Sequence, residues 1–294
     1  MKVGTTIPNH WGVANVHDVV ELAEQAERMH YASVWTMDHL LNVGRVRERL
    51  NDQPYWHPMG ILTAVAMRTS RVELGTSVMV LPYHDPVGLA KYSATLDALS
   101  QGRAILGVGV GALVEEFEAL GVPIKRRGAL TDEYIDVIKD LWLNPDPSYK
   151  GGRFNFDNLK FSPVCTRKPH TPIWIGGSSQ AALKRTARIG DGWHPNRIPA
   201  GDYAKCVADL EVHAQRSGRA LADITLSLRM DLDPSKPVTA ASVSEFIDQI
   251  GPYRDAGLEH LVVAFTSGDV PSIHAWMSAF AEAAQLENGI MRHT

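Results

Sequence analysis

The chain has 294 residues, of which 45% are hydrophobic and 21% are charged, and its formal net charge is −4. This composition is typical of a globular protein and excludes disordered, fibrous and coiled-coil chains. The basic residues form no tract that could neutralise nucleic-acid phosphates, and no apolar segment has the length of a membrane span. The N-terminus lacks the apolar core of a signal peptide, and Cys165 and Cys206 form no redox or metal motif. We therefore expect a cytoplasmic protein that has neither nucleic acid nor a membrane as its partner.

The first half of the chain alternates short apolar segments with helical patterns. The predicted strands are residues 3–7, 33–37, 72–80 and 104–108. The predicted helices are residues 16–26, 59–67, 87–99 and 131–143. Asn15 is the expected cap of the first helix, and Asp85 followed by Pro86 is the expected start of the third.

Residues 144–171 interrupt this alternation, because they are rich in proline, glycine and aromatic residues. Within them, residues 149–154 predict a surface hairpin. The alternation then resumes with predicted strands at 172–175, 192–194, 224–230 and 261–265. The predicted helices are 179–189, ending at Gly190, then 203–217, a helix opened by a capping box of Ser242 and Glu245, and 271–286.

Eight strands, each followed by a helix, predict an α/β protein with the (β/α)8 barrel (TIM barrel) architecture. We expect one domain over residues 1–286, an insertion after the fourth strand at about 109–171, and a C-terminal tail at 287–294. The alternative is an open, doubly wound sheet, which also alternates strands and helices. The count of eight favours a closed barrel, and its weakest member is the short segment 192–194.

In such a barrel the chemistry lies at the C-terminal ends of the strands. The segments that follow the first six strands are rich in histidine, glycine and aromatic residues. They are residues 8–11, 38–39, 81–84, 109–111, 176–179 and 194–196. This composition suits a planar aromatic ligand that carries a phosphate.

The segment Gly176-Gly177-Ser178-Ser179 joins a predicted strand to a predicted helix. Its glycines let backbone N–H groups approach an anion, and its serines add hydroxyl donors at the positive end of the helix dipole. A tight turn with a serine cap and no ligand is the alternative.

A second glycine-rich segment, residues 107–112, fits a loose dinucleotide-binding fingerprint. We reject that interpretation because no acidic residue follows on a second strand at the expected distance. Two interpretations stay open, namely a loop flattened against a ring and close packing of a strand on a helix.

Asp38 and His39 end the second predicted strand. A histidine there can exchange a proton near neutral pH, and a neighbouring carboxylate can orient it, although a structural hydrogen bond within the core is the alternative. Residues 45–49 are mixed in charge and predict a solvated loop or lid. The sequence contains no zinc-hydrolase motif and no G-x-S-x-G motif, so we expect no metal site and no serine nucleophile.

Taken together, these segments resemble the bacterial luciferase-like family of flavin- and deazaflavin-dependent oxidoreductases. The matching stretches are SVWTMDH (33–39), LDALSQGR (96–103), GVGVG (107–111), EEF (115–117), PIWIGGS (172–178) and GDGW (190–193). The sequence looks most similar to members that use coenzyme F420, a 5-deazaflavin. The resemblance also implies the insertion after the fourth strand and a homodimer.

The resemblance implies a role for several residues. His39 becomes the proton donor or acceptor beside the deazaflavin, with Asp38 against the cofactor. Ser77 and Val78 match a non-proline cis peptide that forms a bulge behind the ring. The remaining cofactor-binding residues are Val110, Gly111 and Glu115 beside the ring, and Gly176, Gly177, Ser178 and Ser179 at the phosphate.

The leading hypothesis is therefore hydride transfer between F420 and a small organic substrate. Ala112 stands where the sugar-phosphate dehydrogenases of the family carry a catalytic acid, which argues against oxidation of a sugar phosphate. The expected substrate pocket comprises Trp11, Trp56, His57, Tyr83 and His84. An FMN-dependent monooxygenase that consumes oxygen is the first alternative, and a barrel that binds a flavin without turnover is the second.

Overall fold

The computed structural model describes residues 1–287 and 289–291. Within them, parallel strands close into a barrel in the order β1 (Lys2–Thr6), β2 (Ser33–Thr36), β3 (Glu73–Thr76), β5 (Ala104–Gly109), β8 (Ile173–Gly176), β9 (Gly192–His194), β10 (Thr225–Leu232) and β11 (His260–Phe265). The barrel is closed because β11 pairs with β1, with Lys2 opposite His260. The predicted TIM barrel is confirmed, and the open doubly wound sheet is excluded.

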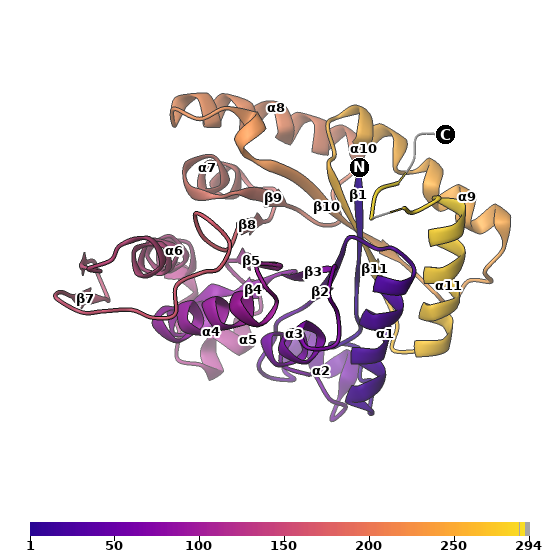
Figure 1. Cartoon of the computed structure of the whole chain (residues 1–294), viewed down its shortest axis with the longest axis horizontal. Coiled ribbons are helices and arrows are strands. Elements are labelled where there is room, and N and C mark those ends of the chain that lie inside the picture. The colour runs from indigo at the N-terminus through magenta and orange to yellow at the C-terminus, as the bar shows by residue number, and fades with distance from the viewer. Residues whose placement is uncertain (288, 292–294) are drawn as a thin grey trace.

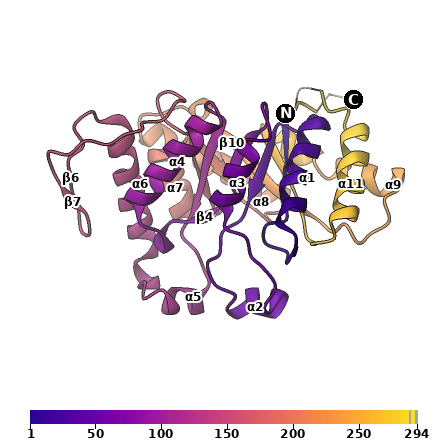
Figure 2. The same cartoon turned by 60° about the horizontal axis from the view of Figure 1, so that its bottom comes forward.

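Helices surround the barrel (Figure 1). They are α1 (Val16–Arg28), α2 (Gly44–Leu50), α3 (Pro58–Ala66), α4 (Pro86–Leu99), α5 (Val114–Ala119), α6 (Arg127–Leu143), α7 (Gln180–Ile189), α8 (Ala200–Arg216), α9 (Ala240–Asp248), α10 (Gly251–Asp255) and α11 (Val270–Ala283). Figure 2 shows α2 and α5 at the end of the barrel opposite the two chain termini. None of the helices in the described part of the chain is long and apolar enough to cross a membrane.

The third predicted strand, 72–80, is divided in the structure. β3 ends at Thr76, and β4 (Met79–Val80) resumes after Ser77 and Val78 and pairs with β5. The peptide bond between Ser77 and Val78 is cis, as the family resemblance predicts. The barrel wall is therefore interrupted at this point, near the C-terminal end of the third strand.

Local signals place most of the helix starts. The Asn15 side chain accepts from His17 N at 3.2 Å, and the Asp85 side chain accepts from Gly88 N at 2.6 Å, so both predicted caps are confirmed. The capping box predicted at Ser242 and Glu245 is wrong. Thr239 is the cap and its hydroxyl accepts from Ser242 N at 3.1 Å, because α9 begins one turn earlier than the sequence pattern suggests.

The segment between α6 and β8 contains the predicted hairpin, in which β6 (Tyr149–Lys150) pairs with β7 (Asn155–Phe156). Residues 45–49, predicted as a loop or lid, belong to helix α2. Within the predicted tail, Met291 N donates to Met1 O at 3.0 Å, while residues 288 and 292–294 lie outside the described part of the chain.

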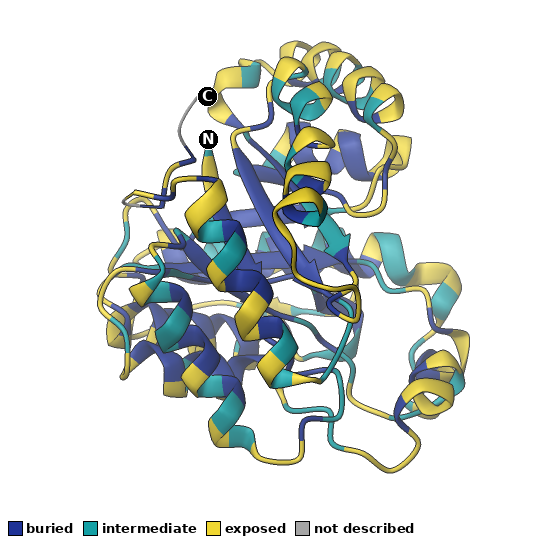
Figure 3. Ribbon diagram, turned by 90° about the vertical axis from the view of Figure 1, so that its right-hand side faces the viewer, coloured by how far each residue is buried: buried dark blue, intermediate teal, exposed yellow. Residues whose placement is uncertain are grey.

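Burial is concentrated in the strands and on the inner faces of the helices, whereas the outer helix faces are exposed (Figure 3). Trp35, Ile105, Trp174 and Val262 form a layer inside the barrel. The Trp35 ring fits there because Gly75 on the neighbouring strand has no side chain, and a Cβ at Gly75 would lie 2.2 Å from the ring. The interior is thus packed, and open space remains at the two ends of the barrel.

Candidate active site

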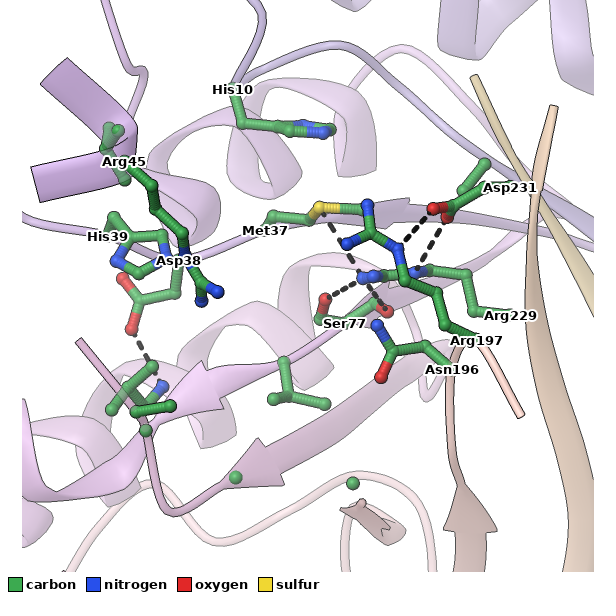
Figure 4. Close-up of a pocket in the computed structure, with 18 of the residues that line it drawn as sticks. His10, Met37, Asp38, His39, Arg45, Ser77, Asn196, Arg197, Arg229 and Asp231 are labelled. Carbon is green, nitrogen blue, oxygen red and sulfur yellow. Dashed lines mark hydrogen bonds and ion pairs between the residues drawn. The ribbon is translucent and has the colours of Figure 1, made fainter. Parts of the chain in front are cut away.

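A cavity of about 490 Å³ lies at the C-terminal ends of the strands. Its lining includes residues that follow β1, β2, β5, β8 and β9, together with Arg45, Val46 and Arg49 of α2. Figure 4 shows Asp38, His39 and Arg45 on one side of this cavity and Asn196, Arg197, Arg229 and Asp231 on the other. The cavity therefore occupies the position where TIM-barrel enzymes hold their substrates.

His39 is held by a carboxylate from α5. Its Nδ1 lies 2.5 Å from Glu116 Oε2, and the Glu116 side chain is fully buried. Glu116 Oε1 also accepts from Leu40 N at 2.6 Å and from Leu41 N at 3.1 Å. Because a carboxylate accepts, this contact places a proton on Nδ1 and leaves Nε2, which makes no hydrogen bond to any described residue, for the cavity.

Asp38 makes no hydrogen bond to the His39 ring, although the two residues are adjacent in the sequence. Asp38 Oδ2 accepts from Val80 N at 2.9 Å and from His84 Nε2 at 2.7 Å, so it ties the end of β2 to β4 and the turn after it. Its other oxygen, Oδ1, is buried without a hydrogen-bond partner among the described residues. The carboxylate that orients His39 is therefore Glu116, which corrects the expectation that the adjacent Asp38 does so.

Val78 supplies one surface of the cavity, beside the cis peptide. Its side chain packs against glycines of the two neighbouring strands β5 and β8, and a Cβ at Gly109 would lie 2.6 Å from Val78 Cγ2. A Cβ at Gly176 would lie 3.1 Å from Val78 Cγ1. The glycines thus allow this side chain to sit against the strand ends, which leaves a smooth apolar surface.

A polar cluster forms the opposite side. Ser77 Oγ lies 2.9 Å from His194 Nε2, and Arg229 Nη1 donates to Ser77 O at 2.9 Å. Burial lowers the pKa of His194 well below its usual range, and the positive charge of Arg229 adds to this effect. His194 is therefore a neutral imidazole that positions Ser77.

Arg229 and Arg197 share one carboxylate. Arg197 Nε donates to Asp231 Oδ2 at 2.6 Å, and Arg229 Nε lies 3.8 Å from Asp231 Oδ1. Arg229 is largely buried, and burial lowers its pKa, although Asp231 opposes this shift. Together with Arg45 and Arg49, these side chains give the cavity more cationic than carboxylate groups, which suits an anionic ligand.

The third side is aromatic. The Tyr55 ring lies 6.1 Å from the His10 ring and 5.8 Å from the His39 ring, while Arg49 lies 4.3 Å above the Trp11 ring. Burial lowers the pKa of His10 well below its usual range, and the positive charges of Arg49 and Arg229 lower it further. His10 Nδ1 and Trp11 Nε1 are buried without hydrogen-bond partners among the described residues.

The structure separates the predicted site residues into two groups. Those that line the cavity are Trp11, Asp38, His39, Ser77, Val78, Val110, Gly111, Gly176 and Gly177. Ser178 and Ser179 lie outside the lining, and Ser179 Oγ accepts from Ala182 N at 3.3 Å as the cap of α7. Glu115 is exposed next to Gly44 and also lies outside the lining.

Four residues predicted for the substrate pocket lie behind the lining. His84 holds Asp38, and the His57 ring lies edge-on to the His84 ring at 6.3 Å. Tyr83 packs edge-on against Phe117 at 4.8 Å, and Trp56 Nε1 donates to Val13 O at 2.8 Å. Of that predicted group, Trp11 alone reaches the cavity.

Several lining residues escaped the sequence analysis. Arg229 and Asp231 lie near the C-terminal end of β10, the seventh barrel strand, which is the signal that marks them. Tyr55 also lines the cavity, and Glu116, which contacts His39 from behind the lining, is 77 residues away from it; no local pattern marks the proximity of either residue to His39.

The unpartnered buried atoms are an indication of a ligand. His10 Nδ1, Trp11 Nε1, Asp38 Oδ1 and Arg229 Nε all belong to residues that line this cavity. Leaving a buried polar atom unsatisfied costs about 1–3 kcal/mol, so a ligand with both donors and acceptors would relieve the cost. The smooth surface at Val78 and these polar atoms fit a flat heterocycle with polar edges.

The family model described as luciferase-like monooxygenase matches residues 1–260. The chain belongs to this family. An uncharacterized protein of Mycobacterium tuberculosis is 35% identical over 170 residues, which cover 55% of this chain and 57% of that relative. The chain thus matches little more than half the length of this relative.

Two further relatives are named F420-dependent glucose-6-phosphate dehydrogenase. The protein of Amycolatopsis mediterranei is 27% identical and the match covers 83% of this chain and 87% of the relative. The protein of Kineococcus radiotolerans is 31% identical, with 74% of this chain and 65% of the relative covered.

Solved structures share the fold. An F420-dependent secondary alcohol dehydrogenase, in complex with an F420–acetone adduct, has a TM-score of 0.81 at 18% identity, with 97% of this chain and 98% of that chain covered. The monooxygenase RslO1 from Streptomyces bottropensis has a TM-score of 0.78 at 22% identity, with 97% and 99% covered. These likenesses show that the chain shares its fold with these two structures.

Proposed function

We propose that this chain is an F420-dependent oxidoreductase that transfers a hydride between the deazaflavin and a small organic substrate. The observation that carries the proposal is the His39–Glu116 contact, because it leaves one imidazole nitrogen free at a cavity that also includes Gly176 and Gly177. The names of the Amycolatopsis and Kineococcus relatives support F420 as the cofactor. Ala112, in place of a catalytic acid, argues against a sugar phosphate as the substrate.

One group of cavity residues suits the ring of the cofactor and another suits its phosphate. We infer that the ring lies against Val78 and Gly109 to Gly111, where Asp38 Oδ1 would accept from a donor on the ring edge. The phosphate would lie at Gly176 and Gly177, with Ser178 and Ser179 just beyond. Gly177 has a φ of +97°, which turns the backbone at the start of α7, and the N-terminus of that helix favours an anion.

When bound, the deazaflavin supplies a carbon that gives or takes a hydride. His39 Nε2 gives or takes the accompanying proton, while the Nδ1–H group keeps donating its hydrogen bond to Glu116. The buried Glu116 carboxylate fixes the ring orientation and compensates for the positive charge that the ring carries when Nε2 is protonated. Helix α2, through Arg45 and Arg49, covers part of the cavity, which helps to exclude water from it.

An FMN-dependent monooxygenase is the second candidate, since the family description and the similarity to RslO1 both point to that chemistry. Titration of the purified protein with each cofactor separates the two. We expect the fluorescence of F420 to change at micromolar protein while FMN shows no binding. Binding of FMN with no response to F420 would contradict the proposal and favour the monooxygenase.

A further inference from the structure

Tyr55 is held rigidly beside the cavity. The next residue, Trp56, is fixed on both sides by the buried Asn9, because Trp56 N donates to Asn9 O at 2.8 Å and Asn9 Nδ2 donates to Trp56 O at 2.8 Å. Asn9 is itself tied to β2, since Met37 N donates to Asn9 Oδ1 at 2.9 Å. The Tyr55 ring also packs against Val46, Leu50 and Leu113. Its position is thus set by the barrel as well as by α2.

The hydroxyl of Tyr55 has no hydrogen-bond partner in the described part of the chain. Tyr55 lines the cavity, and its hydroxyl makes no hydrogen bond to any described residue. Burial raises the pKa of Tyr55 well above its usual range, and the negative charge of Asp38 raises it further, against the opposing effect of Arg49. The hydroxyl therefore stays protonated and is a donor at neutral pH.

The phenol lies between two imidazoles at one side of the cavity. The His39 ring is edge-on to it at 5.8 Å, with an interplanar angle of 79°, and the His10 ring is 6.1 Å away. Tyr55 and His39 both line the cavity, and neither the Tyr55 hydroxyl nor His39 Nε2 makes a hydrogen bond to a described residue. Two groups of this kind suit one substrate oxygen: an alcohol oxygen accepts from Tyr55 and donates its proton to Nε2, and a carbonyl oxygen accepts from Tyr55 and from the protonated Nε2.

We propose that the Tyr55 hydroxyl and His39 Nε2 bind one oxygen atom of the substrate, so that the site takes a ketone or aldehyde and the corresponding alcohol. This inference rests on the proposed function. In the reductive direction the carbonyl carbon gains a hydride, which carries the two electrons that reduced F420 gives up, and the carbonyl oxygen gains one proton from His39 Nε2. Tyr55 donates a hydrogen bond to that oxygen as negative charge develops on it and keeps its own proton.

The test uses the F420-loaded protein with cyclohexanone as the probe. In Tyr55→Phe the ring and its packing remain and only the donor is lost. We expect kcat for cyclohexanone reduction to fall by about 10²-fold, as for the loss of one donor to a developing oxyanion. We also expect the Kd of cyclohexanone, followed by the deazaflavin fluorescence, to rise about tenfold. The melting temperature and the Kd of F420 should stay at their wild-type values.

Tyr92→Phe is the matched control, since the Tyr92 hydroxyl lies 3.1 Å from Thr63 Oγ1 at the outer surface of the barrel. It should behave like the wild type. Wild-type kinetics in Tyr55→Phe, together with lost turnover in His39→Ala, would overturn the role of Tyr55 and leave the proposed function standing. A wild-type protein that binds F420 but neither reduces nor binds cyclohexanone would overturn the substrate class alone. A protein that does not bind F420 would overturn both proposals.

Discussion

The two ends of the barrel both hold a cavity lined by charged side chains, but they differ in how those side chains are satisfied. At the N-terminal end, a cavity of about 390 Å³ is lined by Lys2, Glu73, Arg167 and His260, among others. Lys2 Nζ and Arg167 Nη1 donate to Glu73 at 3.0 and 3.2 Å, and His260 Nε2 lies 2.7 Å from Ser33 Oγ. Among the described residues, none that lines this cavity has a buried side-chain atom without a hydrogen-bond partner.

The C-terminal end is the opposite case, since four of its lining residues, namely His10, Trp11, Asp38 and Arg229, each carry such an atom. Polar groups are buried at both ends of the barrel, but at the N-terminal end the described ones all have hydrogen-bond partners within the protein, whereas at the C-terminal end four do not. The difference supports the proposal that the C-terminal end binds the ligand, whereas the polar groups at the N-terminal end bind one another. Substitutions at the two ends should therefore have separable effects.

The largest effect should come from the histidine at the ligand end. His39→Ala removes the proton donor, so we expect kcat to fall by about 10³-fold with the carbonyl probe that the wild type reduces fastest. The Kd of F420 should change by less than about twofold, because the ring and phosphate contacts proposed above do not include His39. The exposed His17 provides the control, and His17→Ala should keep wild-type kinetics. Full activity in His39→Ala would remove His39 from the mechanism.

The next effect concerns acid stability at the other end. Burial lowers the pKa of His260 to about 4, against the opposing effect of Glu73. The unfolded chain, with a histidine pKa of about 6.5, then binds this proton more readily than the folded protein does. The contribution of His260 to the free energy of unfolding is therefore fully present above pH 6.5, and about 3 kcal/mol of it is lost as the pH drops to 4.

Chemical denaturation of wild type and His260→Gln across this pH range measures the difference. The free energy of unfolding of the variant should fall less on acidification, because its unfolding takes up one proton fewer over this pH range. An identical pH dependence in the two proteins would show that His260 does not titrate as described. Cofactor affinity should be unaffected at neutral pH, since His260 lies away from the C-terminal cavity.

Glu116→Gln tests how the imidazole is oriented. The amide can keep its oxygen on Leu40 N and Leu41 N, but its NH2 group then faces Nδ1, which favours the wrong tautomer. We expect kcat to fall by about 10- to 30-fold, which is less than the loss of the ring itself. Glu118→Gln, on the exposed side of the same helix, is the control. A change in KM with an unchanged kcat would argue that Glu116 shapes binding instead.

The smallest effect is expected for the ion-pair cluster at the N-terminal end. Glu73→Gln weakens contacts with Lys2 and Arg167, whose side chains are 51% and 37% exposed. Because solvent screens such pairs, the free energy of unfolding should fall by about 1 kcal/mol or less. F420 binding and turnover should remain at wild-type values, and a loss of either without a loss of stability would break the separation between the two ends.

Sequence patterns predicted the fold well because its signals are local. Eight apolar strand segments, the caps Asn15 and Asp85, and the surface hairpin each depend on residues close together in the chain. The error at Ser242 is equally local, since Thr239 stands three residues earlier with the same capping chemistry. Helix α2 also left a signal, because Val46 and Leu50 are spaced four residues apart, although the surrounding arginines suggested a solvated loop.

The site was predicted less completely because its contacts join distant parts of the chain. Strand ends identified His39 and Gly177, and the resemblance identified the cis peptide at Ser77. The partner of His39, however, is 77 residues away on α5, and it displaced the adjacent Asp38 from that role. Trp56 and His57 were chosen for their composition and position, whereas Tyr55 is the residue of that segment that lines the cavity.

The central claim is that one flat heterocycle lies across the C-terminal cavity, between His39 and the glycine turn at Gly177. A crystal structure of the protein with F420 tests it most directly. The account predicts the ring against Val78, with its phosphate at Gly176 and Gly177 and one face open toward His39 and Tyr55. Density for the cofactor at the N-terminal cavity, or anywhere outside the residues that line the C-terminal one, would contradict the account.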